Sequence, residues 1–409
     1  MVTERFRFTA FWLNATPITR LFEAIETVGE ARVVGGAVRN SILGEPLGDI
    51  DLATDATPDQ VARAAADAGL SVHETGLAHG TLTIVADGQP FEVTTLREDV
   101  STDGRRATVR FTTDWATDAA RRDFTMNALY AGRDGVGYDY VGGLADCMAR
   151  RVRFIGDPLR RIAEDHLRIL RFFRFHAGYG KGELDADGLA ACRASKCLLT
   201  ELAVERVQAE LMRLLAAKGG PAVVAVVAAD GFLDPFVAPP LDVRTYRALA
   251  EVEAIAGRET SPVLALAALV ARDGARFAAA ADTLRLSRKE RSRGLAAIEA
   301  SREMPPQSVP HSRALLYDHG TEAFTDGLML AVASGVDVID LPHLLADARR
   351  WQRPRFPVSG HDLIGQGGQP GPAVGERLQL LETIWRDADF SLDRASLLAL
   401  DRELLDKRR

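Results

Sequence analysis

The pattern of hydrophobic and polar positions changes near residue 157. Before this point, short apolar runs bounded by Gly, Pro or Asp predict β-strands, and after it apolar residues three and four positions apart predict α-helices. The predicted strands are Ala31–Val34, Asp49–Thr54, Ser71–Glu74, Leu82–Ala86 and Phe91–Leu96. The predicted helices near them are Ile18–Val28 and one that begins at Pro58 after a Thr57 cap. We therefore expect an α+β fold whose N-terminal part holds a small mixed sheet with helices.

The second part of the chain is predicted to be helical almost throughout. Helical periodicity covers Arg160–Ala177, Ala203–Ala217, Pro221–Asp230, Arg244–Ile255, Ser261–Ala271, Arg288–Ser301 and Ala373–Trp385. Breaks are predicted at Gly178–Gly182, Asp234–Pro240, Pro305–Pro310 and Arg353–Pro372. We expect a head (residues 1–150) followed by an all-α neck (151–217), body (218–330) and tail (331–409).

The most informative segment extends from Gly35 to Asp51. Gly35 and Gly36 follow a short apolar strand and precede a predicted helical turn, an arrangement in which backbone amides bind anions. Asp49 and Asp51 are two residues apart on a predicted strand, so their side chains share a face. Two such carboxylates repel each other unless a cation lies between them, and Mg²⁺ prefers oxygen ligands of this kind. Each feature alone is usually a simple turn or a solvated loop, but their combination predicts metal-assisted nucleotidyl transfer.

This pattern resembles the opening signature of the DNA polymerase β-type nucleotidyltransferases. The version with Arg39 is similar to the branch of bacterial tRNA CCA-adding enzymes and poly(A) polymerases. The resemblance implies a polymerase β-like head in which Gly36 and Arg39 hold a triphosphate and the two aspartates hold metal ions. One departure is Asn40, because the family usually has aspartate after this arginine.

Two further segments are predicted to lie beside the metal-binding strand. Glu92, in the strand candidate Pro90–Leu96, is either a third carboxylate that positions an attacking 3′-hydroxyl or a solvent-facing glutamate. The long polar segment Asp99–Trp115, with a Gly104 hinge, is either a lid or a plain connector, and Ala107–Thr112 alternates like a hairpin strand.

The segment Arg121–Ala128 is predicted to form one helix. Asp123 and Asn127 would then stand one turn apart on the same face and hold a ribose, while Arg122 meets a triphosphate. Taken alone, the octet is also explained by a charged helix with local ion pairs. Beside the other segments it closely resembles the second motif of the family, which handles sugar and phosphate.

The most discriminating segment is Glu164–Phe175, predicted as part of one helix with a buried stripe at Ile162, Ile169, Leu170 and Phe173. Asp165 and Arg168 lie on its other side. A carboxylate accepts from the amino group of cytosine or adenine, and a guanidinium donates to a ring nitrogen, whereas uracil and guanine present the inverse pattern. The pair therefore suits CTP and ATP. The alternative is a helix with one Asp–Arg pair and a solvated basic face.

The Glu-Asp-x-x-Arg element of this segment resembles the protein template of class II tRNA nucleotidyltransferases. By that resemblance Asp165 and Arg168 select the incoming base, and Arg171 and Arg174 assist with base or phosphate. Leu202–Leu211 is similar to the fifth motif of the family, in which we expect Arg206 and Glu210 to form an i,i+4 pair as structural braces. The C-terminal segments Phe356–Ile364 and Gly371–Phe390 resemble the tail of the alphaproteobacterial branch.

Composition constrains the compartment more than the function. The net charge is −7, which does not indicate a nucleic-acid binder, although binding follows the local field and not the total. The three cysteines show no metal-binding spacing, and an odd number argues against a disulfide framework. No apolar run approaches the roughly 20 residues of a membrane helix. We expect a cytoplasmic protein with no membrane partner.

Together these features predict a CTP(ATP):tRNA nucleotidyltransferase that uses Mg²⁺ and adds the terminal C-C-A to tRNA, with tRNA, CTP and ATP as substrates and no protein partner. The nearest alternative is a poly(A) polymerase of the same family. An alternative of another class is a catalytically inactive RNA-binding protein. An antibiotic-modifying transferase would share the aspartate pair but would not need the Glu164–Arg174 segment.

Overall fold

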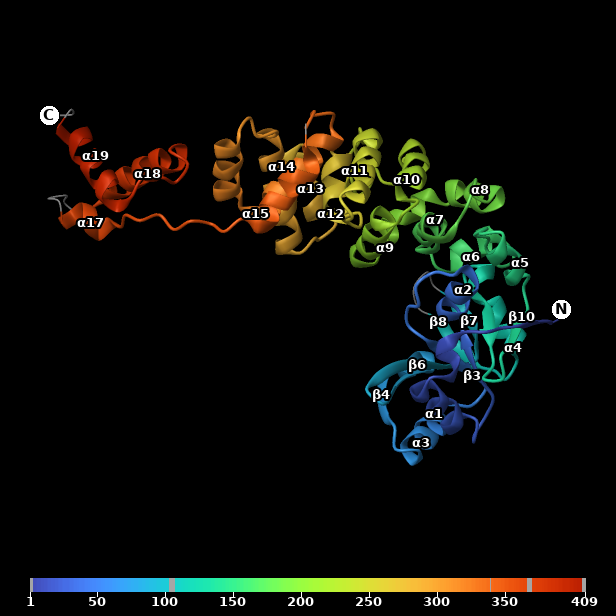
Figure 1. Cartoon of the computed structure of the whole chain (residues 1–409). Helices are drawn as coiled ribbons and strands as arrows, with labels where there is room; N and C mark the ends of the chain where they lie inside the picture. Colours follow the sequence, from blue (N-terminus) through green and yellow to red (C-terminus); the bar gives the residue numbers. More distant parts are fainter. Residues whose placement is uncertain (1–2, 103–106, 339, 366–369, 407–409) are drawn as a thin grey trace. The chain divides into compact units, whose positions relative to one another are not determined.

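The computed structural model describes residues 3–102, 107–338, 340–365 and 370–406. The chain divides into two compact units, Met1–Pro235 and Phe236–Arg409, which we describe separately (Figure 1). The α+β class is confirmed, with all strands of the described residues in the first unit. The finer division into head, neck, body and tail stays a prediction.

An eight-stranded mixed sheet forms the centre of the first unit. Its strands are β1 (Glu4–Arg7), β2 (Ala31–Val34), β3 (Asp51–Thr54), β4 (Ser71–Gly76), β5 (Thr81–Ala86), β6 (Gln89–Thr95), β9 (Leu129–Ala131) and β10 (Val136–Asp139). Their order is β1-β10-β9-β2-β3-β6-β5-β4. β3 and β6 run parallel, and the other neighbouring strands are antiparallel. All five predicted strands are present, although β3 begins at Asp51 and so leaves Asp49 in the preceding loop.

A second, two-stranded ribbon lies beside this sheet. It pairs β7 (Arg97–Thr102) with β8 (Ala107–Phe111), which confirms the predicted hairpin strand. The proposed hinge at Gly104 lies outside the described residues.

Short helices surround the sheet. They are η1 (Phe11–Asn14), α1 (Thr16–Ile25), α2 (Gly36–Leu43), α3 (Pro58–Asp67), η2 (Leu77–His79), α4 (Trp115–Ala120), η3 (Thr125–Asn127) and α5 (Gly143–Met148). The predicted cap of α3 is confirmed, because Thr57 and Gln60 form a capping box. α1 and α3 pack on each other and on β5.

The predicted helix Arg121–Ala128 is wrong. α4 ends at Ala120, Phe124 is extended (φ −120°, ψ 146°), and Thr125–Asn127 form a single 3-10 turn. The reason is pairing with a distant segment: Phe124 makes a β-bridge with Phe154, and the backbone amide of Thr125 donates to the carbonyl of Arg153 at 2.9 Å. This backbone pairing replaces the local helical hydrogen bonds.

The single predicted helix over Arg160–Ala177 is also wrong. The structure has two helices, α6 (Pro158–Glu164) and α7 (Arg168–Tyr179), and Asp165 between them is extended (φ −153°, ψ 106°). Side chains stabilise the break, since Arg168 donates to the carbonyl of Arg161 at 2.9 Å and Asp165 accepts from the amide of Leu167 at 3.2 Å. Asp165 and Arg168 therefore do not share one helix.

The predicted apolar stripe of this segment is confirmed, because all four of its residues are buried. Further helices of the first unit are α8 (Ala186–Ala194), η4 (Lys196–Glu201), α9 (Val204–Ala216) and α10 (Gly220–Ala229). α7 packs against α9 and α10. Aromatic rings join α7 to the sheet region. The ring of Phe154 stacks on that of Phe172 with 5.4 Å between ring centroids, and the ring centroids of Phe124 and Phe175 are 5.1 Å apart.

The second unit is helical in its described residues. It comprises α11 (Val243–Ile255), α12 (Pro262–Leu269), α13 (Gly274–Thr283), α14 (Arg288–Arg302), α15 (Val309–Ala333), α16 (Leu341–Arg350), α17 (Gly360–Gly365), α18 (Pro372–Asp387) and α19 (Arg394–Asp406). The buried carboxylate of Asp326 pairs with Arg258 and Arg293. An apolar cluster centred on Leu381 and Trp385 joins α18 to α15, α17 and α19. None of the described helices has the length and apolar character needed to span a bilayer.

We predict that Gly143→Ala destabilises the first unit. A Cβ at Gly143 would lie 2.1 Å from the carbonyl oxygen of Thr125, so η3 must shift. The free energy of unfolding should fall by about 1–3 kcal/mol, measured by denaturant titration. Gly178→Ala is the matched control, because nothing lies within 4 Å of that Cβ and alanine favours the helix. Equal stability of Gly143→Ala and wild type would contradict the close packing of α5 on η3.

Candidate active site

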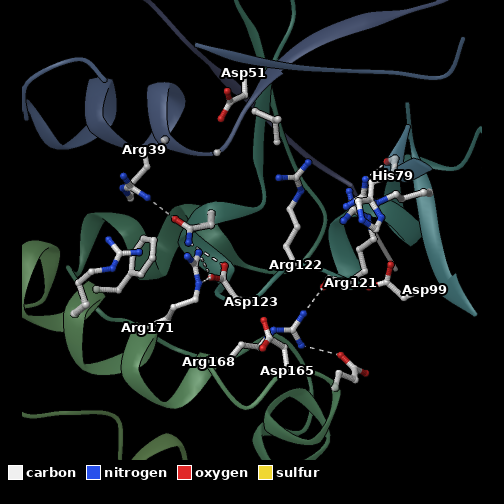
Figure 2. Close-up of a pocket in the computed structure, with 18 of the residues that line it drawn as sticks. Arg39, Asp51, His79, Asp99, Arg121, Arg122, Asp123, Asp165, Arg168 and Arg171 are labelled. Carbon is white, nitrogen blue, oxygen red and sulfur yellow. Dashed lines mark hydrogen bonds and ion pairs between the residues drawn. The ribbon is translucent and has the colours of Figure 1, made fainter. Parts of the chain in front are cut away.

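A cavity of about 740 Å³ opens in the first unit between the sheet region and helices α6, α7 and α9 (Figure 2). Residues far apart in sequence line it, from Val34 to Arg213. All predicted site residues except Glu92 line this pocket: Gly36, Arg39, Asp49, Asp51, Arg122, Asp123, Asn127, Asp165, Arg168, Arg171 and Arg174. The structure therefore brings the predicted residues together, while their individual roles stay predictions.

The glycine turn has a backbone that other residues rarely adopt. Gly35 has φ 73° and ψ −117°, and α2 begins at the next residue. A Cβ at Gly35 would lie 3.6 Å from the carbonyl oxygen of Asn127 and 4.0 Å from Nη1 of Arg122. Glycine thus lets β2 turn sharply into α2 beside a guanidinium, which suits an anion at this end of the helix.

Three carboxylates lie near the start of β3, without forming one closed cluster. Asp49 and Asp51 line the pocket on either side of buried Ile50, and Glu92 on β6 is the register partner of Asp51. The side chain of Glu92 is exposed. Burial, then Glu92, then Asp49 raise the pKa of Asp51 to about 6. A divalent cation fits this donor set, because it would relieve the repulsion between the carboxylates.

The described residues contain no group of three acidic, histidine or cysteine side chains close enough to enclose a metal ion. Mg²⁺ commonly takes one or two protein carboxylates and completes its shell with substrate phosphates and water. Asp49 and Asp51 are therefore the residues that would hold such an ion, with Glu92 beside them.

The guanidinium of Arg122 is held in place by Asp118 and Tyr130. Its Nη2 donates to Asp118 at 3.0 Å and its Nε donates to the Tyr130 hydroxyl at 3.1 Å. Burial alone would raise the pKa of Asp118, but the positive charges of Arg122 and Arg121 hold this pKa well below its usual range. These contacts leave Nη1 of Arg122 facing the Gly35 turn, where a phosphate could be bound.

Asp123 and Asn127 meet in the pocket although no helix joins them. Asp123 accepts from Nε and Nη2 of Arg171 at 2.9 and 2.6 Å, and from Nδ2 of Asn127 at 3.0 Å. Burial opposes the charged carboxylate, but Arg171 and Asn127 lower the pKa of Asp123 to about 2. Asp123 is thus a fixed anion that orders its neighbours, and a ribose hydroxyl would have to share its oxygens.

Asp165 and Arg168 both reach the pocket, but each is held by other residues. Asp165 pairs with Arg206 of α9 at 2.8 Å. Arg168 pairs with Glu164 at 2.7 Å and donates to the carbonyl of Arg121 at 3.2 Å. They are therefore two separately positioned groups (Figure 2).

The predicted pair within α9, Arg206 with Glu210, is wrong. Arg206 binds Asp165, and buried Glu210 instead pairs with Arg174 and lies 3.7 Å from Arg171. The i,i+4 spacing allowed a local pair, but both side chains point to α7 and its preceding loop. Their expected role as braces agrees with these contacts.

Several residues that line the pocket are not predicted from the sequence. They include His79 on η2 and Arg97 on β7. The guanidinium of Arg97 donates to the backbone carbonyl of His79, which joins these two segments. Burial and nearby Arg121 lower the pKa of Arg97 to about 10. Asp99, the first residue of the long polar segment Asp99–Trp115, also lines the pocket. No local signal marks these residues, because only the fold brings β7 to the cavity.

The pocket is positively charged although the chain is acidic. Eight arginines and six acidic residues line it, against a net charge of −7 for the whole chain. A local surplus of fixed guanidinium groups attracts polyanions whatever the total charge.

Comparison with known proteins agrees with this geometry. Residues 31–153 match the family of the poly A polymerase head domain. The CCA tRNA nucleotidyltransferase 1, mitochondrial, of Danio rerio is 35% identical over 374 residues, which cover 90% of this chain and 86% of that protein. The chain belongs to the family of CCA-adding tRNA nucleotidyltransferases.

Two further members of the CCA-adding family support the assignment. The CCA-adding enzyme of Limosilactobacillus fermentum is 30% identical and covers 95% of this chain and 97% of its own length. The crystal structure of the Bacillus stearothermophilus CCA-adding enzyme in complex with CTP matches with a TM-score of 0.78 at 25% identity, over 96% of this chain and 99% of that one. Nucleotidyltransferases of this family generally use divalent metal ions.

We predict that divalent-cation binding weakens as pH falls through about 6. The folded-state pKa of Asp51 is raised to about 6, so below it a proton must leave before the cation binds, and above it this competition vanishes. The Mn²⁺ dissociation constant, measured by electron paramagnetic resonance, should be about tenfold larger at pH 5 than at pH 7.5. Asp51→Asn should remove this dependence. Equal affinity at both pH values would show that Asp51 is not a ligand.

Proposed function

We propose that this chain is a cytoplasmic CTP(ATP):tRNA nucleotidyltransferase that restores the terminal C-C-A of tRNA with Mg²⁺. The observation that carries the proposal is one cavity lined by the glycine turn, the aspartate pair and the Asp165/Arg168 pair. The family resemblance supplies the substrates, and the free state of all three cysteines fits a reducing compartment.

Different residues of the pocket bind the triphosphate, the sugar and the metal ion. The Gly35–Gly36 turn, Arg39 and Arg122 bind the triphosphate, and Asp123 with Asn127 orders the sugar region. Asp49 and Asp51 hold Mg²⁺, with Glu92 nearby to orient the 3′-hydroxyl of the tRNA. The ion, when bound, neutralises charge on the attacking and leaving oxygens. The tRNA 3′-hydroxyl attacks the α-phosphate of CTP or ATP, and pyrophosphate leaves.

Base selection depends on hydrogen-bonding atoms that remain available. Arg168 uses both Nη1 N–H groups and one of Nη2, which leaves Nε and one Nη2 N–H for a ring nitrogen. Asp165 accepts from Nη2 of Arg206 and keeps further lone pairs to accept from an exocyclic amino group. This donor and acceptor pattern fits cytosine and adenine and rejects uracil and guanine.

The direct test offers the purified protein three RNAs with each labelled NTP: a tRNA lacking C-C-A, a tRNA ending in C-C, and oligo(A). The proposal predicts C, C and A on the first tRNA and a single A on the second. Long A tracts on any RNA would identify a poly(A) polymerase. No incorporation with Mg²⁺ would favour the inactive RNA-binding protein.

We predict that Asp51→Asn lowers kcat for CMP transfer by about a thousandfold, because the metal loses a charged ligand. Asp55→Asn is the matched control: Asp55 directly follows β3, accepts from the amide of Glu30 at 2.7 Å, and does not line the pocket. Single-turnover kinetics distinguish the two variants. Equal losses in both would indicate damage to the strand.

We predict that Arg168→Gln blurs nucleotide choice. The ratio of kcat/KM for CTP over UTP should fall by the equivalent of about 1–3 kcal/mol, because a donor to the cytosine ring is lost. Arg160→Gln is the control, since Arg160 also lies 3.6 Å from Glu164 but is mostly exposed. An unchanged ratio in Arg168→Gln would disprove the role of Arg168 in base selection.

A further inference from the structure

Arg39 differs from most of the arginines that line the pocket, because the described residues give it no carboxylate partner. Arg122, Arg168, Arg171 and Arg174 each form an ion pair with a buried or half-buried carboxylate. Arg39 is only 5% exposed, yet within the described ranges no Asp or Glu lies at ion-pair distance from its guanidinium. Its positive charge is therefore buried without a counter-ion in direct contact.

Two neutral amides hold this guanidinium in place. Oδ1 of Asn40 accepts from Nε at 3.1 Å and from Nη2 at 2.8 Å, and Oδ1 of Asn127 accepts from Nη1 at 2.5 Å. The amide orientations follow from their other ends, because Asn40 Nδ2 donates to the carbonyl of Pro46 and Asn127 Nδ2 donates to Asp123. The ring of Tyr179 covers one face of the guanidinium, and its centroid lies 3.8 Å from Cζ of Arg39.

The remaining donors are suited to a phosphate. A guanidinium has five N–H groups, and these contacts use three of them, which leaves one on each terminal nitrogen. Arg39 lines the pocket together with the Gly35–Gly36 turn. An aspartate at position 40 could accept the same two hydrogen bonds but would cancel the charge.

We infer that Asn40 is a positioning residue for binding of the triphosphate and of the pyrophosphate product: it orients Arg39 and, being neutral, leaves the full positive charge of Arg39 available to phosphate oxygens. This inference rests on the proposed function and gives a physical meaning to the departure from the aspartate usual in the family. Burial lowers the pKa of Arg39, as expected for a guanidinium without a paired carboxylate, and a bound phosphate would offset this.

Asn40→Asp tests the inference directly. The KM for CTP and the inhibition constant of pyrophosphate should both rise about tenfold, because a neutralised Arg39 attracts phosphate less. The change in kcat should be smaller. The unfolding temperature of the nucleotide-free protein should change little, because the ion pair gained with Arg39 offsets the hydrogen bond that Asn40 Nδ2 donates to the carbonyl of Pro46. Asn14→Asp, which adds the same charge at an exposed site outside the pocket, should leave both constants unchanged.

The same substitution made in the Arg39→Gln variant separates a positioning role of Asn40 from a structural one. In Arg39→Gln, the further change Asn40→Asp should have no effect on either constant, because the residue acts through Arg39. An unaltered pyrophosphate constant in Asn40→Asp, or an equal effect in the Arg39→Gln background, would overturn the inference. Calorimetry with inorganic pyrophosphate alone gives the same comparison without turnover, so a failure of tRNA addition by wild type would refute the proposed function separately.

Discussion

The buried carboxylate of Asp123 holds the two walls of the pocket together. It accepts two hydrogen bonds from Arg171 of α7 and one from Asn127, whose own oxygen binds Arg39 at the start of α2. A continuous chain of polar contacts thus runs from the arginines of α7 to the glycine turn. Burying a charge is costly unless polar partners compensate it, so each of these four side chains depends on its neighbours in this chain of contacts.

The same requirement explains why the pocket is built from arginines that are already fixed. Arg122 is held by Asp118 and Tyr130, Arg168 by Glu164, and Arg174 by Glu210. Each contact uses some N–H groups of an arginine that lines the cavity and leaves others unused, since a guanidinium has five. Donors that are fixed before substrate arrives need little reorganisation, which favours stabilisation of developing charge. The acidic total charge of the chain does not oppose this, because the field of the cavity is local.

Local patterns in the sequence were sufficient for much of the fold and site. The strand before Gly35, the following helix, and many of the residues that line the pocket were identified from short segments, whereas features that depend on long-range partners were missed. The helix predicted over Arg121–Ala128 failed because Phe124 pairs with Phe154, some thirty residues away. The placement of Glu92 beside Asp51 depends on the parallel register of β6 on β3, which no local pattern fixes. His79 and Arg97 lacked any signal for the same reason.

The predicted base-selecting pair, Asp165 and Arg168, does not lie on one face of a single helix, because the chain is extended at Asp165. Had Arg160–Ala177 been continuous, helix geometry alone would set the spacing of Asp165 and Arg168. Instead, Arg206 of α9 places Asp165, while Glu164 and the carbonyl of Arg121 place Arg168. The distance between the two groups is therefore set by tertiary contacts from three segments, so a small change in the packing of α9 alters the pair without altering the motif. The proposed base selection would accordingly be a property of the folded first unit, because the five-residue Glu-Asp-x-x-Arg segment alone does not fix the positions of Asp165 and Arg168.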